Sequence, residues 1–168
     1  MALLKNGYLS QDELQKLPGV PTPERLAKGP VVVIECAQEI PCNPCETACA
    51  KGAIHIGENI IELPVLEEEK CSGCALCVAA CPGQAIFVVD ATYSETEGTV
   101  TLPYEYLPLP QKGDLVDGLN RAGEAVCTAR VLRVVNPEKY DHTAVITIAV
   151  PKALIMEVRS LRRKQSEV

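Results

Sequence analysis

Runs of apolar, largely β-branched residues recur along the chain and predict most of its regular structure. The strongest runs, each expected to form a strand, are residues 31–35, 85–89, 125–135 and 143–150. Residues 54–56 form a shorter run of the same kind, and residues 59–63 are a candidate to extend its pairing. The pattern therefore predicts a protein built mainly from short strands.

Two segments have the pattern of helices. Residues 10–17 begin with Ser10, and Glu13 follows three positions later, which is a capping-box pattern. Residues 152–164 follow a proline and end in basic residues, which suits the negative end of a helix dipole. Between the first helix and the first strand, residues 20–30 contain three prolines and predict an extended arm. This arm is expected either to lie on a neighbouring subunit or to be a disordered tail.

The charge balance favours a protein partner over a nucleic acid. The chain has 16 Lys and Arg residues against 22 Asp and Glu residues, for a formal net charge of −6. An acidic protein lacks the positive footprint that phosphate binding needs, and it suits docking onto the basic patch of a partner. No apolar run has the length of a membrane span, and Lys5 interrupts the start that a secretory signal would need.

A compact run of cysteines carries the chemistry of the chain. Residues 71–82 read C-x2-C-x2-C-x3-C-P without a gap. Two-residue spacers make a tight loop that wraps three thiolates around one iron–sulfur cube, and the three-residue spacer carries the fourth thiolate away from it. The run therefore predicts 4Fe–4S ligands, which are Cys71, Cys74, Cys77 and Cys81.

A second cysteine run lies upstream and repeats the first. A shift of 32 positions superposes Cys42, Cys45, Cys49, Ala53 and Ile54 on Cys74, Cys77, Cys81, Ala85 and Ile86. Each half then reads strand, cysteine loop, short helix and strand. The repeat predicts two similar cluster sites.

Residues 31–90 resemble the two-cluster bacterial-type ferredoxins. In that family the fourth cysteine of each run ligates the other cluster. The resemblance implies one cluster held by Cys71, Cys74, Cys77 and Cys49. It implies a second cluster held by Cys42, Cys45, Cys81 and one further ligand.

The further ligand is where this sequence departs from the family pattern. The register of the repeat puts Glu39 where a cysteine is expected, and the nearest upstream thiol is Cys36, with five residues between it and Cys42. Cys36 can ligate through this longer loop, because five residues readily span the corner of a cube. Two alternatives stay open, namely an oxygen ligand from Glu39 and a site that holds only three irons.

Three other uses of the cysteines fit the sequence less well. Structural zinc usually takes two well-separated cysteine pairs rather than a compact triplet. A disulfide scaffold is disfavoured because nine cysteines are an odd number and are sparse in 168 residues. A redox dithiol needs only two cysteines. Cys127 stands alone within a predicted strand and is expected to be a buried apolar thiol. Lys51 follows the upstream run and is either a cation near a cluster or a solvated surface lysine.

The expected fold class is α+β. It combines a ferredoxin-like two-cluster pseudo-repeat with a small β-rich C-terminal module that ends in a helix. The expected divisions are residues 1–30 as the N-terminal helix and arm, residues 31–90 as the cluster domain, and residues 91–168 as a docking module. No catalytic constellation or dinucleotide fingerprint appears, so the chain itself is expected to be non-catalytic.

The stretch from Gly29 to Glu46 resembles the iron–sulfur subunits found beside FAD-dependent amine, proline or opine-type dehydrogenase subunits. This resemblance implies an electron-transfer subunit in a hetero-oligomer, with two 4Fe–4S clusters on this chain and FAD or FMN on its partners. A cytoplasmic location is expected for such oxygen-sensitive clusters. The alternatives are a free-standing soluble ferredoxin and a zinc-binding adaptor without redox activity.

Overall fold

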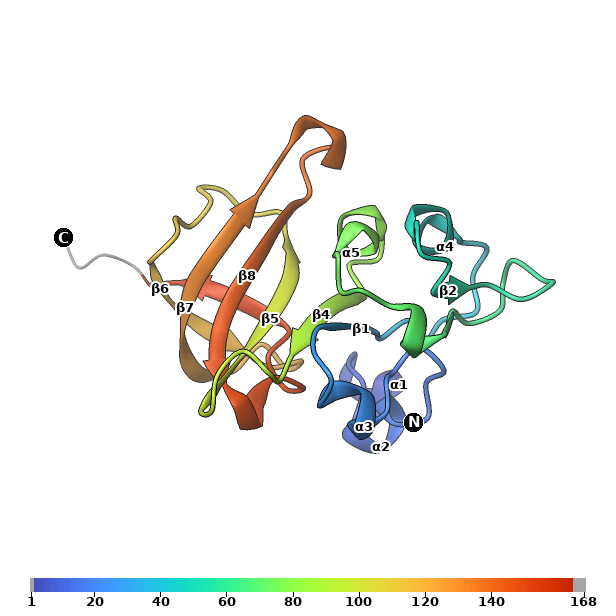
Figure 1. Cartoon of the computed structure of the whole chain (residues 1–168), viewed down its shortest axis with the longest axis horizontal. Helices are drawn as coiled ribbons and strands as arrows, with labels where there is room; N and C mark the ends of the chain where they lie inside the picture. Colours follow the sequence, from blue (N-terminus) through green and yellow to red (C-terminus); the bar gives the residue numbers. More distant parts are fainter. Residues whose placement is uncertain (1, 165–168) are drawn as a thin grey trace.

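The computed structural model describes residues 2–164 and is built on one antiparallel sheet of seven strands (Figure 1). In spatial order the strands are β1 (Val31–Ile34), β4 (Ile86–Asp90), β5 (Glu97–Tyr104), β8 (Ala144–Pro151), β7 (Ala125–Val135), β6 (Leu115–Leu119) and β9 (Ser160–Arg163). A separate two-stranded ribbon joins β2 (Ile54–His55) to β3 (Val65–Leu66). The chain therefore has a sheet-rich mixed fold.

The helices of the described chain are short. The α-helices are α1 (Ala2–Asn6), α2 (Gln11–Leu14), α3 (Pro23–Leu26), α4 (Pro44–Ala48) and α5 (Leu76–Ala80). Three 3-10 turns are η1 (Glu68–Lys70), η2 (Glu138–Tyr140) and η3 (Lys152–Leu154). Helices α4 and α5 lie against each other beside the large sheet, while α1 to α3 gather near the N-terminus (Figure 1). None of the helices in residues 2–164 is long and apolar enough to cross a bilayer.

Strands β1 and β4 lie at one edge of the large sheet, and we call this pair the β1–β4 ribbon. The β1–β4 ribbon separates two hydrophobic cores. All four residues of β1 are buried, because its alternating side chains face apolar layers on both sides. Val31 and Val33 join the core of the large sheet, and that core takes residues from all seven strands. Val32 and Ile34 face the other way, into the core that contains Cys45 and Cys77. One side of this ribbon thus supports the cysteine loops, and the other supports the C-terminal strands.

Four of the predicted strands are confirmed as β1, β4, β7 and β8. The short strand at residues 54–56 is confirmed as β2, but its partner is β3 and not residues 59–63. Strand β6 was not predicted, because Gly118 and its polar neighbours resemble a turn. Packing explains the glycine at position 118, because a Cβ there would lie 2.8 Å from Cys127 Sγ on β7.

The expected C-terminal helix over residues 152–164 is wrong. Residues 152–154 form the turn η3, and residues 160–163 form β9, which pairs with β6. The basic residues therefore do not lie at the end of a helix, and the Arg159 side chain is only 4% exposed. Pairing and burial therefore override a good local helix propensity.

The extended arm expected at residues 20–30 is also wrong. This segment contains helix α3, which begins after Thr22 with Pro23 in its first turn. The segment folds onto its own chain, because Arg25 is buried and bonded to backbone carbonyls of residues 29, 30, 68 and 71. The short helix predicted upstream is confirmed in shortened form as α2, with the capping box of Ser10 and Glu13 present.

The region after residue 91 is continuous with the region before it. Strand β5 pairs with β4 on one side and with β8 on the other, so one sheet crosses the expected boundary. We therefore describe residues 91–164 as the C-terminal strands of a shared sheet.

Candidate functional site

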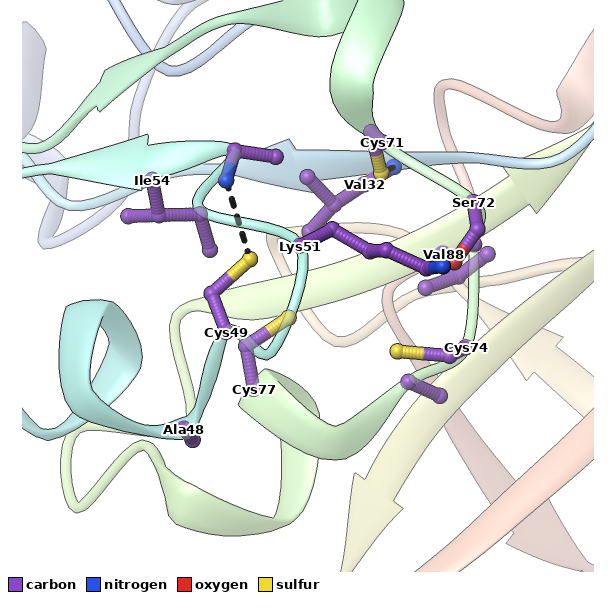
Figure 2. Close-up of a pocket in the computed structure, with 13 residues that line it drawn as sticks. Val32, Ala48, Cys49, Lys51, Ile54, Cys71, Ser72, Cys74, Cys77 and Val88 are labelled. Atoms are coloured by element: carbon purple, nitrogen blue, oxygen red, sulfur yellow. Dashed lines mark hydrogen bonds between the residues drawn. The ribbon is translucent and has the colours of Figure 1, made fainter.

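Two cavities with four cysteines each lie on the α4–α5 side of the β1–β4 ribbon. The first, which we call the Cys71 site, encloses about 340 Å³ including space open to solvent, and its cysteine side chains converge on it (Figure 2). Its cysteines are Cys49, Cys71, Cys74 and Cys77.

The second cavity, which we call the Cys36 site, has a similar size. It encloses about 390 Å³, again including space open to solvent. Its cysteines are Cys36, Cys42, Cys45 and Cys81. The structure thus brings the eight candidate residues together in two groups of four, while Cys127 lies on β7 and lines neither cavity.

Helices α4 and α5 distribute the thiols between the two cavities. Cys45 lies in α4 and lines the Cys36 site, whereas Cys49 caps the same helix and lines the Cys71 site. Cys77 and Cys81 have the same relationship on α5, in the opposite sense. A spacing of four residues keeps both thiols near one helix face but separates them by about 6 Å along the axis. Each short helix therefore delivers one thiol to each cavity.

Unusual backbone conformations shape the loop before α5. Gly73 has φ of 66° and Ala75 has φ of 64°, so the chain turns sharply between Cys71 and Cys77. Gly73 also lies close to the N-terminal segment, because a Cβ there would be 2.6 Å from Pro30 Cβ. The spacers in this run are therefore small for two reasons, which are the turn and the contact with Pro30.

Backbone amides point at two sulfur atoms of the Cys71 site. Val32 donates its N–H to Cys71 Sγ at 3.4 Å. Ala53 donates its N–H to Cys49 Sγ at 3.2 Å, and this bond is the dashed line at Cys49 in Figure 2. Such bonds direct the positive ends of amide dipoles at the two sulfur atoms. Lys51 also lines this cavity, with its side chain extending toward Ser72 (Figure 2).

Burial controls the protonation of the innermost thiols. It raises the pKa of Cys77 to about 12, and the neighbouring Cys71, Cys74 and Cys49 thiols contribute to this rise. Burial also raises the pKa of Cys45 to about 11, with added repulsion from Cys81 and Cys42. A cationic metal core reverses this balance, because metal ligation replaces the thiol protons.

The donor atoms of the two cavities are of the kind that iron–sulfur clusters take. Four thiols spread around a cavity, with amide donors aimed at their sulfurs, have the chemistry that an iron–sulfur cube needs.

Cys36 and Glu39 are the candidates for the further ligand beside Cys42, Cys45 and Cys81, and they lie on different cavities. Cys36 follows β1 by two residues and lines the cavity that holds Cys42, Cys45 and Cys81. Glu39 instead lines a separate surface hollow, together with Leu3, Leu9 and Glu13.

Sequence reasoning missed the buried position of Arg25 beside the cysteine loop. Its guanidinium reaches the backbone of Cys71, although residues 20–30 were expected to be an arm. A signal was present in the sequence, because Thr22 followed by Pro23 is a typical start of a helix.

Comparison with known proteins identifies the cysteine region. Residues 40–85 match the family of 4Fe-4S dicluster domains. A segment of 47 residues is 45% identical to one subunit of the ion-translocating oxidoreductase complex of Methanosarcina acetivorans, and covers 28% of this chain and 17% of that protein. A segment of 59 residues is 32% identical to an uncharacterized ferredoxin of Methanocaldococcus jannaschii, and covers 35% of this chain and 34% of that protein. No solved structure matches the chain.

These matches concern only part of each protein. The chain spans about a third or less of the length of these two curated relatives. Within that limit, residues 40–85 are similar to 4Fe-4S dicluster domains, and one of the two relatives is by name a ferredoxin. The matched domain begins at residue 40 and therefore leaves out Cys36.

Proposed function

We propose that this chain relays single electrons through two 4Fe–4S clusters, one at the Cys71 site and one at the Cys36 site. The observation that carries the proposal is the grouping of eight cysteines around two cavities, with α4 and α5 each contributing to both. When bound, each cluster supplies a centre that accepts and releases one electron.

The residues of the chain hold and shield these centres. Cys45 and Cys77 are the buried thiols of the two sites, whereas Cys74 is exposed. The apolar core around Cys45 and Cys77 excludes water from the inner side of both cavities. The exposed position of Cys74 leaves one edge of the Cys71 site open to a redox partner.

We propose Cys36 as the fourth ligand of the Cys36 site. Its position on that cavity supports this assignment, and Glu39 lies on another hollow. Thiolate is also the softer ligand and suits an iron–sulfur core better than a carboxylate does. The longer loop before Cys42 then replaces the two-residue spacer of the other run.

We further propose that the chain is a subunit of a hetero-oligomeric oxidoreductase with FAD or FMN on its partners, located in the cytoplasm. One relative is by name a subunit of an oxidoreductase complex. The flavin assignment rests on the resemblance of residues 29–46 to iron–sulfur subunits that accompany FAD-dependent dehydrogenases.

An exposed apolar surface beside the Cys36 site supports docking of such a partner. Ile40, Ile60 and Ile61 are 49%, 46% and 36% exposed. They lie close to the site, because Ile40 lines the cavity and Cys42 donates its N–H to the carbonyl of Ile60 at 3.4 Å. Exposed carboxylates in the same loops favour a partner surface with a basic rim, and they are Glu39, Glu58 and Glu62.

Anaerobic purification from the native cells tests this function. We expect about eight irons per copy of this chain, a broad visible absorption band, and co-eluting chains that carry flavin. Iron in a lone monomer would instead support a free-standing ferredoxin. Zinc in a colourless protein would support the adaptor and contradict electron transfer.

A further inference from the structure

Arg25 joins Cys71, the first cysteine of the downstream run, to the N-terminal segment. The residue is 8% exposed, and its guanidinium donates to four backbone carbonyls. Nη2 donates to the Cys71 carbonyl at 2.8 Å, and Nε donates to the Glu68 carbonyl at 2.9 Å. The other two bonds run to the carbonyls of residues 29 and 30, at 3.2 and 3.1 Å. A rigid guanidinium thus joins α3 to the turn that ends at Cys71.

Arg121 and Arg159, from the C-terminal half of the chain, both bond to Glu35, the residue before Cys36. Arg121, from the β6–β7 turn, donates Nε to Glu35 Oε2 at 2.8 Å and Nη2 to Glu35 Oε1 at 2.6 Å. Arg159, just before β9, donates Nε to the same Oε1 at 2.5 Å. The side chains of these three residues are between 4% and 9% exposed.

The two arginines are themselves held in place by the chain around them. Arg121 Nη2 also donates to the carbonyl of Met156 at 2.8 Å. Arg159 Nη1 donates to the carbonyls of Ile155 and Val158 at 2.8 and 2.6 Å, and its guanidinium lies 5.0 Å from the ring centre of Phe87 on β4. The group is therefore a buried bidentate pair with a second, stacked cation.

The arginine contacts near Cys71 and near Cys36 lie at equivalent places in the two cysteine loops. Each one acts where regular structure ends and the loop of ligands begins, at the end of η1 for Cys71 and just after β1 for Cys36. The need is greater at Cys36, because residues 35–43 have no helix or strand and five residues separate Cys36 from the next cysteine.

We propose that three buried arginines outside residues 40–85 are positioning residues, each specific to one cluster site: Arg25 for the Cys71 site, and Arg121 with Arg159 for the Cys36 site. This inference rests on the proposed function. In a free chain, an unfastened loop would sample many backbone positions, and ordering it would oppose ligation. Each set of arginine contacts lowers that ordering cost at one site, so the segments outside residues 40–85 serve cluster retention.

Two parent variants, each lacking a ligand of one cluster site, allow iron retention to be measured at the other site alone. Cys42→Ser removes a ligand of the Cys36 site, and Cys74→Ser removes a ligand of the Cys71 site. Each parent is expected to retain about four irons after anaerobic reconstitution. Arg25→Gln and Arg121→Gln are then introduced separately into both parents, and iron, sulfide and the EPR signal of the reduced protein are measured.

Each arginine substitution is expected to lower the iron content of only one of the two parents. Arg121→Gln should remove at least half of the remaining iron from the Cys74→Ser parent and leave the Cys42→Ser parent unchanged, and Arg25→Gln should do the reverse. Arg130→Gln is the matched control, because Arg130 is also an arginine of the C-terminal strands but pairs with Glu97 on the surface. Arg121→Lys and Arg25→Lys keep the charge and should restore part of the lost iron.

Equal iron loss from both parents, or no loss from either, would overturn the inference. A general folding defect would lower iron in both parents. Circular dichroism of the metal-free chains, including the Lys variants, detects such a defect directly. The proposed function fails separately, namely if the two parents themselves bind no iron.

Discussion

Arg25 donates from Nη2 to the carbonyl oxygen of Cys71 at 2.8 Å, so the N-terminal segment touches the backbone of a candidate cluster ligand. The same loop presents Cys71 Sγ to the amide of Val32 on β1 at 3.4 Å. Cys71 is therefore held from two directions, by α3 through its carbonyl and by the sheet through its sulfur. The segments around residues 40–85 are part of the framework that places the thiols of the Cys71 site.

Substitution of Cys36 should remove the cluster of the Cys36 site. We expect Cys36→Ala to lose about half of the iron, because the cavity would keep only three of its four thiols. Glu39→Gln should retain all of it, since Glu39 lines another hollow. Iron and sulfide analysis of the reconstituted variants checks this. Retention by Cys36→Ala with loss by Glu39→Gln would assign the ligand to the carboxylate.

Gly73→Ala should weaken the Cys71 site. The new methyl group would meet Pro30 Cβ at 2.6 Å at a position with φ of 66°. Overpacking and the left-handed conformation together should lower the free energy of unfolding by about 2–4 kcal/mol. Thermal and urea unfolding of the reconstituted protein measure the change.

Gly83→Ala is the matched control for this substitution. Gly83 follows the same cysteine run, but no atom lies within 4 Å of its added Cβ and its φ is not positive. We expect its unfolding free energy to stay within about 0.5 kcal/mol of the parent value. If the two variants were equally stable, the close contact between Gly73 and Pro30 would be in doubt.

Lys51 should raise the reduction potential of the cluster at the Cys71 site. Its cation lines that cavity, and a nearby positive charge favours the more negative, reduced cluster. Because the side chain is exposed, Lys51→Gln should lower the potential by only about 10–40 mV, equivalent to about 0.2–1 kcal/mol for one electron. Redox titration followed by EPR measures the shift, with the exposed Lys112→Gln as a control of equal charge. Equal shifts in both variants would indicate a general charge effect.

Leu102→Ala tests whether the strands of the large sheet share one core. Leu102 is fully buried on β5, and its core includes residues from β1 and β4 beside the cysteine loops. We expect a loss of about 2–5 kcal/mol in unfolding free energy. Val126→Ala on β7 should cost much less, because Val126 is 37% exposed. Two separate unfolding transitions in Leu102→Ala, with only one affected, would contradict a shared core.

The two cysteine groups were implied by the resemblance to two-cluster ferredoxins, in which the fourth cysteine of each run ligates the other cluster. The four-residue separations on α4 and α5 agree with this grouping, because they set the two thiols of each helix apart along its axis. The strands β1, β4, β7 and β8 were also predictable, since their β-branched runs are long or buried on both faces. The ligand role of each cysteine remains a prediction.

The failures came from contacts between segments distant in sequence. Residues 152–164 have good helix formers, yet pairing with β6 makes β9 from their last part. Arg159 was predicted to be one of the basic residues near the end of a helix, and only the fold shows that it bonds to Glu35 from a distant part of the chain. Arg25 was missed for the same reason, because its carbonyl partners belong to backbone groups that no sequence pattern marks.

The most direct test of two clusters on this chain is metal and sulfide analysis of the anaerobically reconstituted protein, with EPR of the fully reduced form. We predict about eight irons and eight sulfides per chain, and signals from two reduced clusters in one molecule. About seven irons would instead indicate that the Cys36 site holds a three-iron core. Zinc without sulfide, or only about four irons, would contradict the two-cluster relay.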